Sequence, residues 1–176
     1  MIVEGAEVFY PKDLVRFADA YGRMPIQSPE LFGFIADTLP AYMHTLTTTE
    51  LGMVCRAFAN AAMYNDAFVD TLCTEAEQRA ATFAAADGLI FLEGLAEIQA
   101  GLPRDMQRDD NKVITAIVKH LISVVSALDS DALIRLFATL VKLDYYDPKL
   151  LHNRVCSLLA LRMAQSEARP SFTALT

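Results

Sequence analysis

Apolar residues recur at helical spacing along most of the chain, and the pattern is clearest between residues 48 and 82. Two runs there place an apolar residue every three or four positions, which predicts a buried face on each of two helices. The first run is Leu51, Val54, Cys55, Phe58, Ala59 and Ala62, and the second is Phe68, Val69, Leu72, Cys73, Ala76 and Ala80. Because a short polar break at residues 64–66 separates the runs, the segment is predicted to be an antiparallel helical hairpin.

The ends of these two helices carry residues that favour helix initiation. Thr48 or Thr49 can cap the first helix, and Glu50 places a negative charge in its first turn. Asn65 or Asp66 can cap the second helix. Helices this short are marginal in isolation, so packing between them must supply most of their stability.

Similar patterns occur on both sides of this hairpin. Upstream, Tyr10-x6-Phe17-Ala18-x-Ala20 matches Leu51-x6-Phe58-Ala59-x-Ala61. In this match Phe17 corresponds to Phe58, 41 residues later. Pro29 then stands where proline suits the first turn of the next helix. Downstream, the spacing of Leu51, Val54 and Phe58 is repeated by Leu133, Leu136 and Leu140. A more divergent unit lies between, with a longer and more charged loop at 102–108.

Recurrence of a helical hairpin at this period is typical of helical-repeat proteins. The predicted fold is therefore all-α, a right-handed α-solenoid of about four antiparallel helical hairpins. The hairpins are expected at about 4–46, 48–82, 86–128 and 130–167, within a single domain of residues 1–168. Residues 169–176 are expected to form a C-terminal tail.

The chain is apolar for a small protein, with 53% hydrophobic residues among 176 and a mean hydropathy of +0.27. Its longest apolar segment, 113–128, is interrupted by Lys119 and His120 and is too short to span a bilayer. We therefore expect no membrane contact, and we expect other protein subunits of a larger complex to cover part of the apolar surface.

The formal net charge of −7 argues against a protein that works by neutralising phosphates. The densest basic cluster is Arg104, Arg108 and Lys112, and acidic residues are interleaved with it. This cluster is either a solvated loop or, together with Lys119, a surface that binds RNA directly.

The three cysteines, Cys55, Cys73 and Cys156, each lie on a predicted apolar helix face. We expect buried free thiols, with a Cys55–Cys73 disulfide as the alternative. The three histidines fall in different predicted hairpins, and His120 is expected to be packed rather than reactive. No nucleophile, phosphate loop or metal-ligand spacing is evident, so we expect no enzyme activity, no cofactor, no metal and no small-molecule substrate.

The last predicted helix has apolar residues on more than one face. Leu151, Val155, Leu158 and Leu159 form the predicted inner face. Outside that face stand Leu150, Leu161 and Met163. A terminal repeat that faces water should be polar on its outer side, so these three residues are either a partner-binding surface or scattered surface side chains.

Two segments carry a resemblance to a known group of proteins. They are Glu50-Leu51-x-Met53-Val54-x-Arg56-Ala57-Phe58-Ala59-Asn60-Ala61 and Asp66-Ala67-Phe68-Val69-Asp70-x-Leu72. This pattern resembles the hairpins of octotricopeptide and heptatricopeptide repeat proteins and of the helical part of FAST-kinase and RAP-domain proteins. The resemblance implies an α-solenoid in mitochondria or chloroplasts that takes part in RNA processing, translation or ribosome-like assemblies. The matched positions are packing positions, so the resemblance assigns no functional residue.

The hypothesis from sequence is a non-catalytic helical-repeat scaffold. It would mediate protein–protein contacts within a mitochondrial RNA-processing, RNA-editing or ribosomal assembly. The alternative is a helical-repeat protein that binds RNA itself.

Overall fold

The computed structural model describes residues 10–24, 28–103, 110–147 and 151–167. Within these ranges the chain is all-helical and contains no strand, which confirms the all-α part of the prediction. The α-helices are α1 (Pro11–Gly22), α2 (Pro29–Thr38), α3 (Thr48–Asn60), α4 (Asp66–Gln78), α5 (Ala85–Gly101), α6 (Asn111–Val124), α7 (Ser130–Lys142) and α9 (Ser157–Glu167). Shorter helical segments are η1 (Leu39–Thr45), η2 (Ala80–Thr82), η4 (Val125–Ala127) and η5 (Leu151–Cys156).

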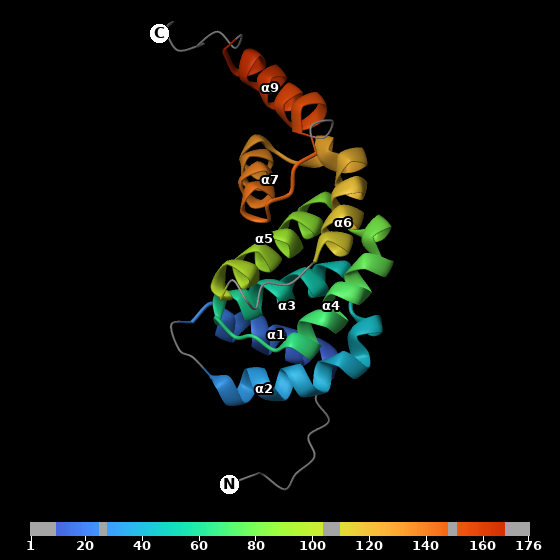
Figure 1. Ribbon diagram of the computed structural model, residues 1–176, viewed down its shortest axis with the longest axis vertical. Coiled ribbons are helices and arrows are strands. Elements are labelled where there is room, and N and C mark those ends of the chain that lie inside the picture. The colour runs from blue at the N-terminus through green and yellow to red at the C-terminus, as the bar shows by residue number, and fades with distance from the viewer. Residues whose placement is uncertain (1–9, 25–27, 104–109, 148–150, 168–176) are drawn as a thin grey trace, which may run out of the picture.

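The helices lie in two rows along the long axis of the molecule (Figure 1). In the first row α1, α3, α5 and α7 follow one another, and each packs against the next. In the second row η1, α4 and α6 are packed in the same way. Each first-row helix also packs against the α-helix that follows it in sequence. Consecutive helices therefore pair, and the pairs lie one upon another.

Local caps define where the helices of the second pair begin. The Thr47 hydroxyl accepts a hydrogen bond from the Glu50 backbone N–H at 3.2 Å, and the Thr47 N–H donates to the Glu50 carboxylate at 2.7 Å. The prediction of Thr48 or Thr49 as the cap is therefore wrong, because this reciprocal pair requires an acid three residues after the cap. Asn65 does cap α4, accepting from the Phe68 N–H at 3.0 Å.

The two predicted faces of this pair form the centre of the hydrophobic core. Phe58 of α3 stacks on Phe68 of α4 at 4.3 Å between ring centroids, and its other neighbour Phe32 of α2 meets it edge-on at 5.0 Å. Ala62 was expected on the buried face but is exposed. It lies beyond the end of α3 with a φ of 51°, where the chain turns away from the helix.

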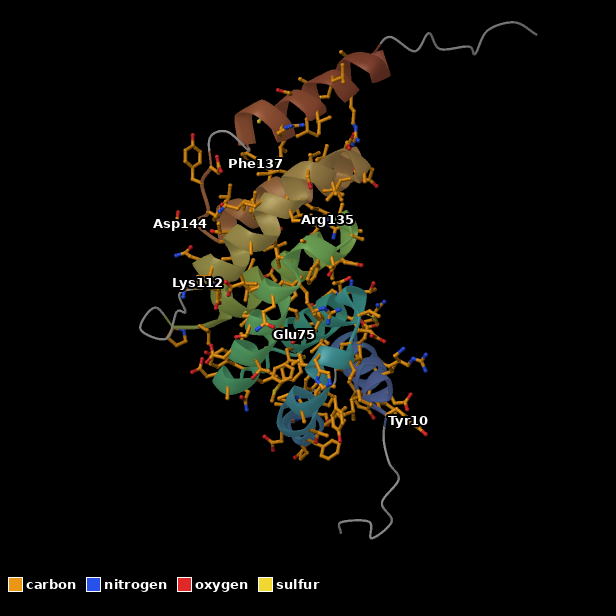
Figure 2. All side chains as sticks on the ribbon, turned by 90° about the vertical axis from the view of Figure 1, so that its right-hand side faces the viewer. Tyr10, Glu75, Lys112, Arg135, Phe137 and Asp144 are labelled. Carbon is orange, nitrogen blue, oxygen red and sulfur yellow. The ribbon has the colours of Figure 1, made fainter. Side chains whose placement is uncertain are left out.

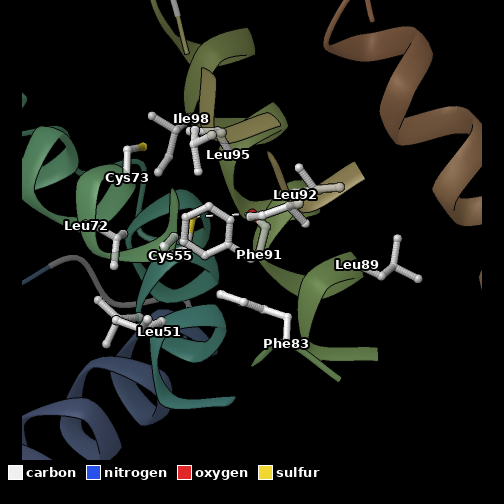
Figure 3. Close-up of a cluster of buried hydrophobic side chains, with 14 of the residues drawn as sticks. Leu51, Cys55, Leu72, Cys73, Phe83, Leu89, Phe91, Leu92, Leu95 and Ile98 are labelled. Carbon is white, nitrogen blue, oxygen red and sulfur yellow. Dashed lines mark hydrogen bonds between the residues drawn. The ribbon is translucent and has the colours of Figure 1, made fainter. Parts of the chain in front are cut away.

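First-row helices approach each other closely. A Cβ on Gly22 of α1 would lie 2.8 Å from the backbone oxygen of Ala57 in α3, so this contact requires a residue without a side chain. Between α3 and α5 the core is continuous, and the Cys55 thiol donates to the Phe91 backbone oxygen at 3.5 Å (Figure 3).

Helices α3 and α7 are equivalent in register, and the displacement between them is 82 residues. The N-caps of the two helices, Thr47 and Asp129, are separated by this displacement. So are Ala62 and Asp144, which follow the helix ends and both have a φ of 51°. The predicted match of Leu133, Leu136 and Leu140 with Leu51, Val54 and Phe58 is confirmed, since all six side chains are buried.

Helix α1 matches α3 at a different register from the one predicted. The N-caps, Tyr10 and Thr47, are 37 residues apart rather than 41. Phe17 is 41% exposed whereas Phe58 is buried, so these two phenylalanines are not equivalent. The sequence match followed similar residue types, whereas the helix ends set the structural register.

Candidate functional site

Large exposed apolar side chains gather in the first and last parts of the chain. In the first part they are Tyr10, Phe17, Met24, Phe34 and Tyr42. In the last part they are Ile134, Phe137, Val141, Tyr146, Leu161 and Met163. Among the described residues from 43 to 133 there is none. Figure 2 shows Tyr10 of the first group and Phe137 of the second toward opposite ends of the long axis.

One face of α7 carries three of these residues, Ile134, Phe137 and Val141, which we call the α7 stripe. Their spacing of three and four places them on one side of the helix. They are 56%, 40% and 62% exposed. A continuous apolar side on a surface helix is a feature of protein-binding sites.

The register between α3 and α7 shows what such a face does elsewhere in this molecule. The α7 stripe corresponds, 82 residues earlier, to Gly52, Cys55 and Ala59 of α3. At the first two of these positions α3 packs against α5: a Cβ on Gly52 would lie 3.3 Å from a backbone oxygen of α5, and the Cys55 thiol donates to α5. Helix α7 therefore exposes the face that a neighbouring helix covers in α3.

A groove adjoins the α7 stripe on the side of the chain's last segment. It has a volume of about 320 Å³ and is lined by Phe137, Leu140, Val141, Asp144, Tyr145, Tyr146 and Cys156. The left-handed conformation of Asp144 turns the chain there, and Tyr146 is 70% exposed. The prediction that Cys156 is buried is wrong, because its thiol lies at this open groove.

The residues of the last helix that were predicted to bind a partner do not all fall on this groove. Leu161 and Met163 are exposed as expected, and Leu150 lies outside the described residues. Leu161 lines a different hollow, of about 230 Å³, with Ile122 and Val125. The predicted inner face is supported at Val155, which is buried.

The predicted RNA-contacting residues are only partly within the described ranges. Lys112 and Lys119 are exposed on α6, seven residues apart and so on the same side of the helix. Arg104 and Arg108 lie outside the described residues. The structure therefore places two lysines on one helix face.

Along the first row of helices, basic side chains form ion pairs with carboxylates of the preceding helix. Arg56 of α3 donates to Asp19 of α1 at 3.0 Å. Arg135 of α7 makes a two-point contact with Glu93 of α5, at 2.7 and 2.5 Å. This hydrogen-bonded contact with the Glu93 carboxylate raises the pKa of Arg135. Cations held in this way do not form a free basic surface for phosphates.

A shallow groove crosses α3, α5 and α7 beside these ion pairs. It has a volume of about 330 Å³ and includes Arg56, Glu93, Arg135 and Lys142 in its lining. Lys142 of α7 pairs with Glu97 of α5, the next acid along α5. Because positive and negative side chains alternate and neutralise one another here, the groove selects for neither an anion nor a cation.

The buried polar groups in the described part of the chain have structural partners. Cys55 and Cys73 are buried free thiols, so the alternative of a disulfide between them is not realised. Burial raises the pKa of the Cys55 thiol well above its ordinary value, with smaller contributions from Cys73 and Asp110. His120 is half-buried with its Nε2 atom 2.9 Å from the Phe83 backbone oxygen, which confirms it as a packed histidine.

The described residues contain no group of three or more His, Cys, Asp or Glu side chains placed to hold a metal ion. None of the helices in the described ranges has the length and apolar character needed to cross a bilayer.

Comparison of the chain with models of protein families, and with curated proteins, finds no match. The α7 stripe was not singled out from the sequence, although a signal for it exists there. Aligned on the 82-residue displacement, Ile134 and Phe137 replace Gly52 and Cys55 at positions that pack between helices. Large apolar residues at these two positions of α7 indicate a helix face suited to contact with another helix.

Proposed function

We propose that this chain is a non-catalytic scaffold that binds another protein at its C-terminal end. The supporting observation is the α7 stripe, which exposes Ile134, Phe137 and Val141 on the face that α5 covers in α3 at Gly52 and Cys55. Burying apolar side chains against a partner would remove them from water, which is the main favourable term in most protein associations. The helix rows favour the finer description of the fold as a right-handed α-solenoid of four helical hairpins.

The chemistry of the α7 stripe favours a helical partner. Three apolar residues in a line along one helix fit the apolar side of a second helix, whose ridges pack into the grooves between them. In α3 the equivalent positions Gly52 and Cys55 are covered by a helix, α5. The adjoining groove at Tyr146 and Cys156 would accept side chains that extend beyond that line.

The assembly we propose is a mitochondrial RNA-processing, RNA-editing or ribosomal complex. This part of the proposal rests on the resemblance of residues 50–72 to organellar helical-repeat proteins. The acidic net charge of −7 and the ion-paired cations of the first row favour binding to protein subunits over binding to RNA.

The test is purification of the tagged chain from its native source, with and without nuclease treatment. A protein scaffold should keep its partner proteins after nuclease treatment. Loss of the partners on nuclease treatment would instead support the RNA-binding alternative, for which Lys112, Lys119, Arg104 and Arg108 are the residues to reverse in charge.

A further inference from the structure

We infer that the α7 stripe of one molecule binds α1 of a second copy, so that copies stack end to end. This inference rests on the proposed function, because it names the partner that covers the α7 stripe. It follows from a second apolar face at the other end of the molecule and from the direction of the ion pairs between first-row helices.

The second apolar surface lies at α1 and consists of Tyr10, Phe17 and Met24, which we call the α1 stripe. Phe17 lies within the helix, Tyr10 is the residue just before it, and Met24 follows its C-cap, so the three residues mark its beginning, middle and end. They are 71%, 41% and 41% exposed. Gly22, which packs against α3, lies five residues after Phe17 and thus about 140° around the helix from it. Phe17, the central residue of the α1 stripe, is therefore turned away from α3.

The two stripes occupy the two open ends of one row. Within the row α3 packs on α1, α5 on α3, and α7 on α5. The described part of the chain has no first-row helix before α1 or after α7. A second copy that places its α1 on the α7 stripe continues the row with the same kind of helix contact. This contact would cover the exposed apolar residues of the α1 and α7 stripes.

The order of acidic and basic partners along the row favours this head-to-tail arrangement. In three ion pairs between first-row helices the acid lies on the earlier helix and the base on the later one. These pairs are Asp19 with Arg56, Glu93 with Arg135, and Glu97 with Lys142. In an end-to-end stack α7 would be the earlier helix and α1 the later one.

The two helices carry charges of the required signs. Asp131 is exposed in the first turn of α7 and Asp144 just beyond its end, whereas Arg16 is exposed in the middle of α1 and Arg23 at its C-cap. Both arginines contact acids of their own helix, yet their side chains are 77% and 61% exposed. The helices of the row run in the same direction, since late positions of one contact late positions of the next. In the stack Asp144 would therefore lie near Arg23, and Asp131 about one helical turn before Arg16. A symmetric contact between two α7 helices would instead bring Asp131 toward Asp144, which like charges oppose.

The test is the concentration dependence of the mass of the purified full chain, measured by sedimentation equilibrium. A head-to-tail interface does not close on itself, so the mass should rise beyond that of a dimer as concentration increases. Phe137→Asp and Phe17→Asp should each weaken association by at least about tenfold, because each puts a charge into an apolar contact. The matched control is Ala86→Asp, which adds the same charge at an exposed position in the first turn of α5.

Mixing the two end variants gives the sharpest outcome. Each variant keeps one intact end, so an equimolar mixture of Phe137→Asp and Phe17→Asp chains should form a 1:1 dimer and nothing larger. Mass that stays monomeric at all concentrations would overturn the inference. So would association that Phe137→Asp abolishes and Phe17→Asp leaves intact, since that result identifies a symmetric α7 contact. A monomeric chain that still retains partner proteins through Phe137 would leave the scaffold proposal standing and refute self-stacking alone.

Discussion

Gly94 of α5 lies against Cys55 of α3 so closely that a Cβ atom at position 94 would be 2.9 Å from the Cys55 Sγ atom. The same Cβ would be 2.8 Å from the backbone nitrogen of Arg56. Both separations are shorter than an ordinary van der Waals contact. The absence of a side chain at Gly94 therefore sets the distance between the two central helices of the first row.

Replacing Gly94 with alanine should destabilise the protein despite the better helix propensity of alanine. The added methyl group must push α5 away from the α3 backbone, and overpacking of this kind costs about 1–3 kcal/mol. The measurement is the free energy of unfolding from urea denaturation. Gly33→Ala is the control: nothing lies within 4 Å of a Cβ at position 33 of α2, so it should be neutral or stabilise by up to about 1 kcal/mol. Equal stabilities of the two variants would refute this close contact.

Thr47→Ala should lower the free energy of unfolding by about 1 kcal/mol. The substitution removes the hydroxyl that accepts from the Glu50 N–H and leaves that donor without its cap. Thr48→Ala, one residue later and inside the helix, should change stability by much less. Thermal and urea denaturation of both variants under the same conditions measures the difference. A larger loss for Thr48→Ala would place the cap where the sequence pattern alone suggested it.

The stability of the protein should fall as the pH rises above about 8.5, where a cysteine in the unfolded chain loses its proton. Burial raises the pKa of Cys55 in the folded state, so the folded protein keeps this proton while the unfolded chain releases it. The contribution of Cys55 is thus fully present below the unfolded pKa and is lost as the pH rises toward the folded pKa. Its slope is at most about 1.4 kcal/mol per pH unit.

The pH measurement compares the wild type with Cys55→Ala by urea denaturation between pH 8 and pH 9.5. The variant should show a shallower fall of stability with pH, whatever its stability at pH 8. Parallel curves would mean that Cys55 ionises equally readily in the folded and unfolded states.

The helical character and most of the buried faces were predictable because they depend on local spacing. Leu51, Val54 and Phe58 are three and four residues apart, and this spacing specifies a helix face without knowledge of its neighbours. The Asn65 cap is equally local, since the donor it satisfies lies three residues away.

The α1 register and the α7 stripe depended on information that is not local. Phe17 and Phe58 look alike in sequence, but one lies at the open end of a row and the other in the core. Cys156 was expected to be buried because its neighbours are apolar, yet the groove beside it is open to solvent. Whether an apolar helix face is covered depends on which helices surround it, and the packing of the rows decides that.

The most direct test of the α7 stripe as a protein-binding surface is nuclease-treated affinity purification of tagged wild type, Phe137→Asp and Ala86→Asp chains, with quantification of each co-purified protein. The Phe137→Asp chain should lose most of the partner proteins that the wild type retains, because a charge replaces the centre of the stripe. The Ala86→Asp chain should retain them. Full retention of the same partners by the Phe137→Asp chain would show that they bind elsewhere and would contradict the proposed docking surface.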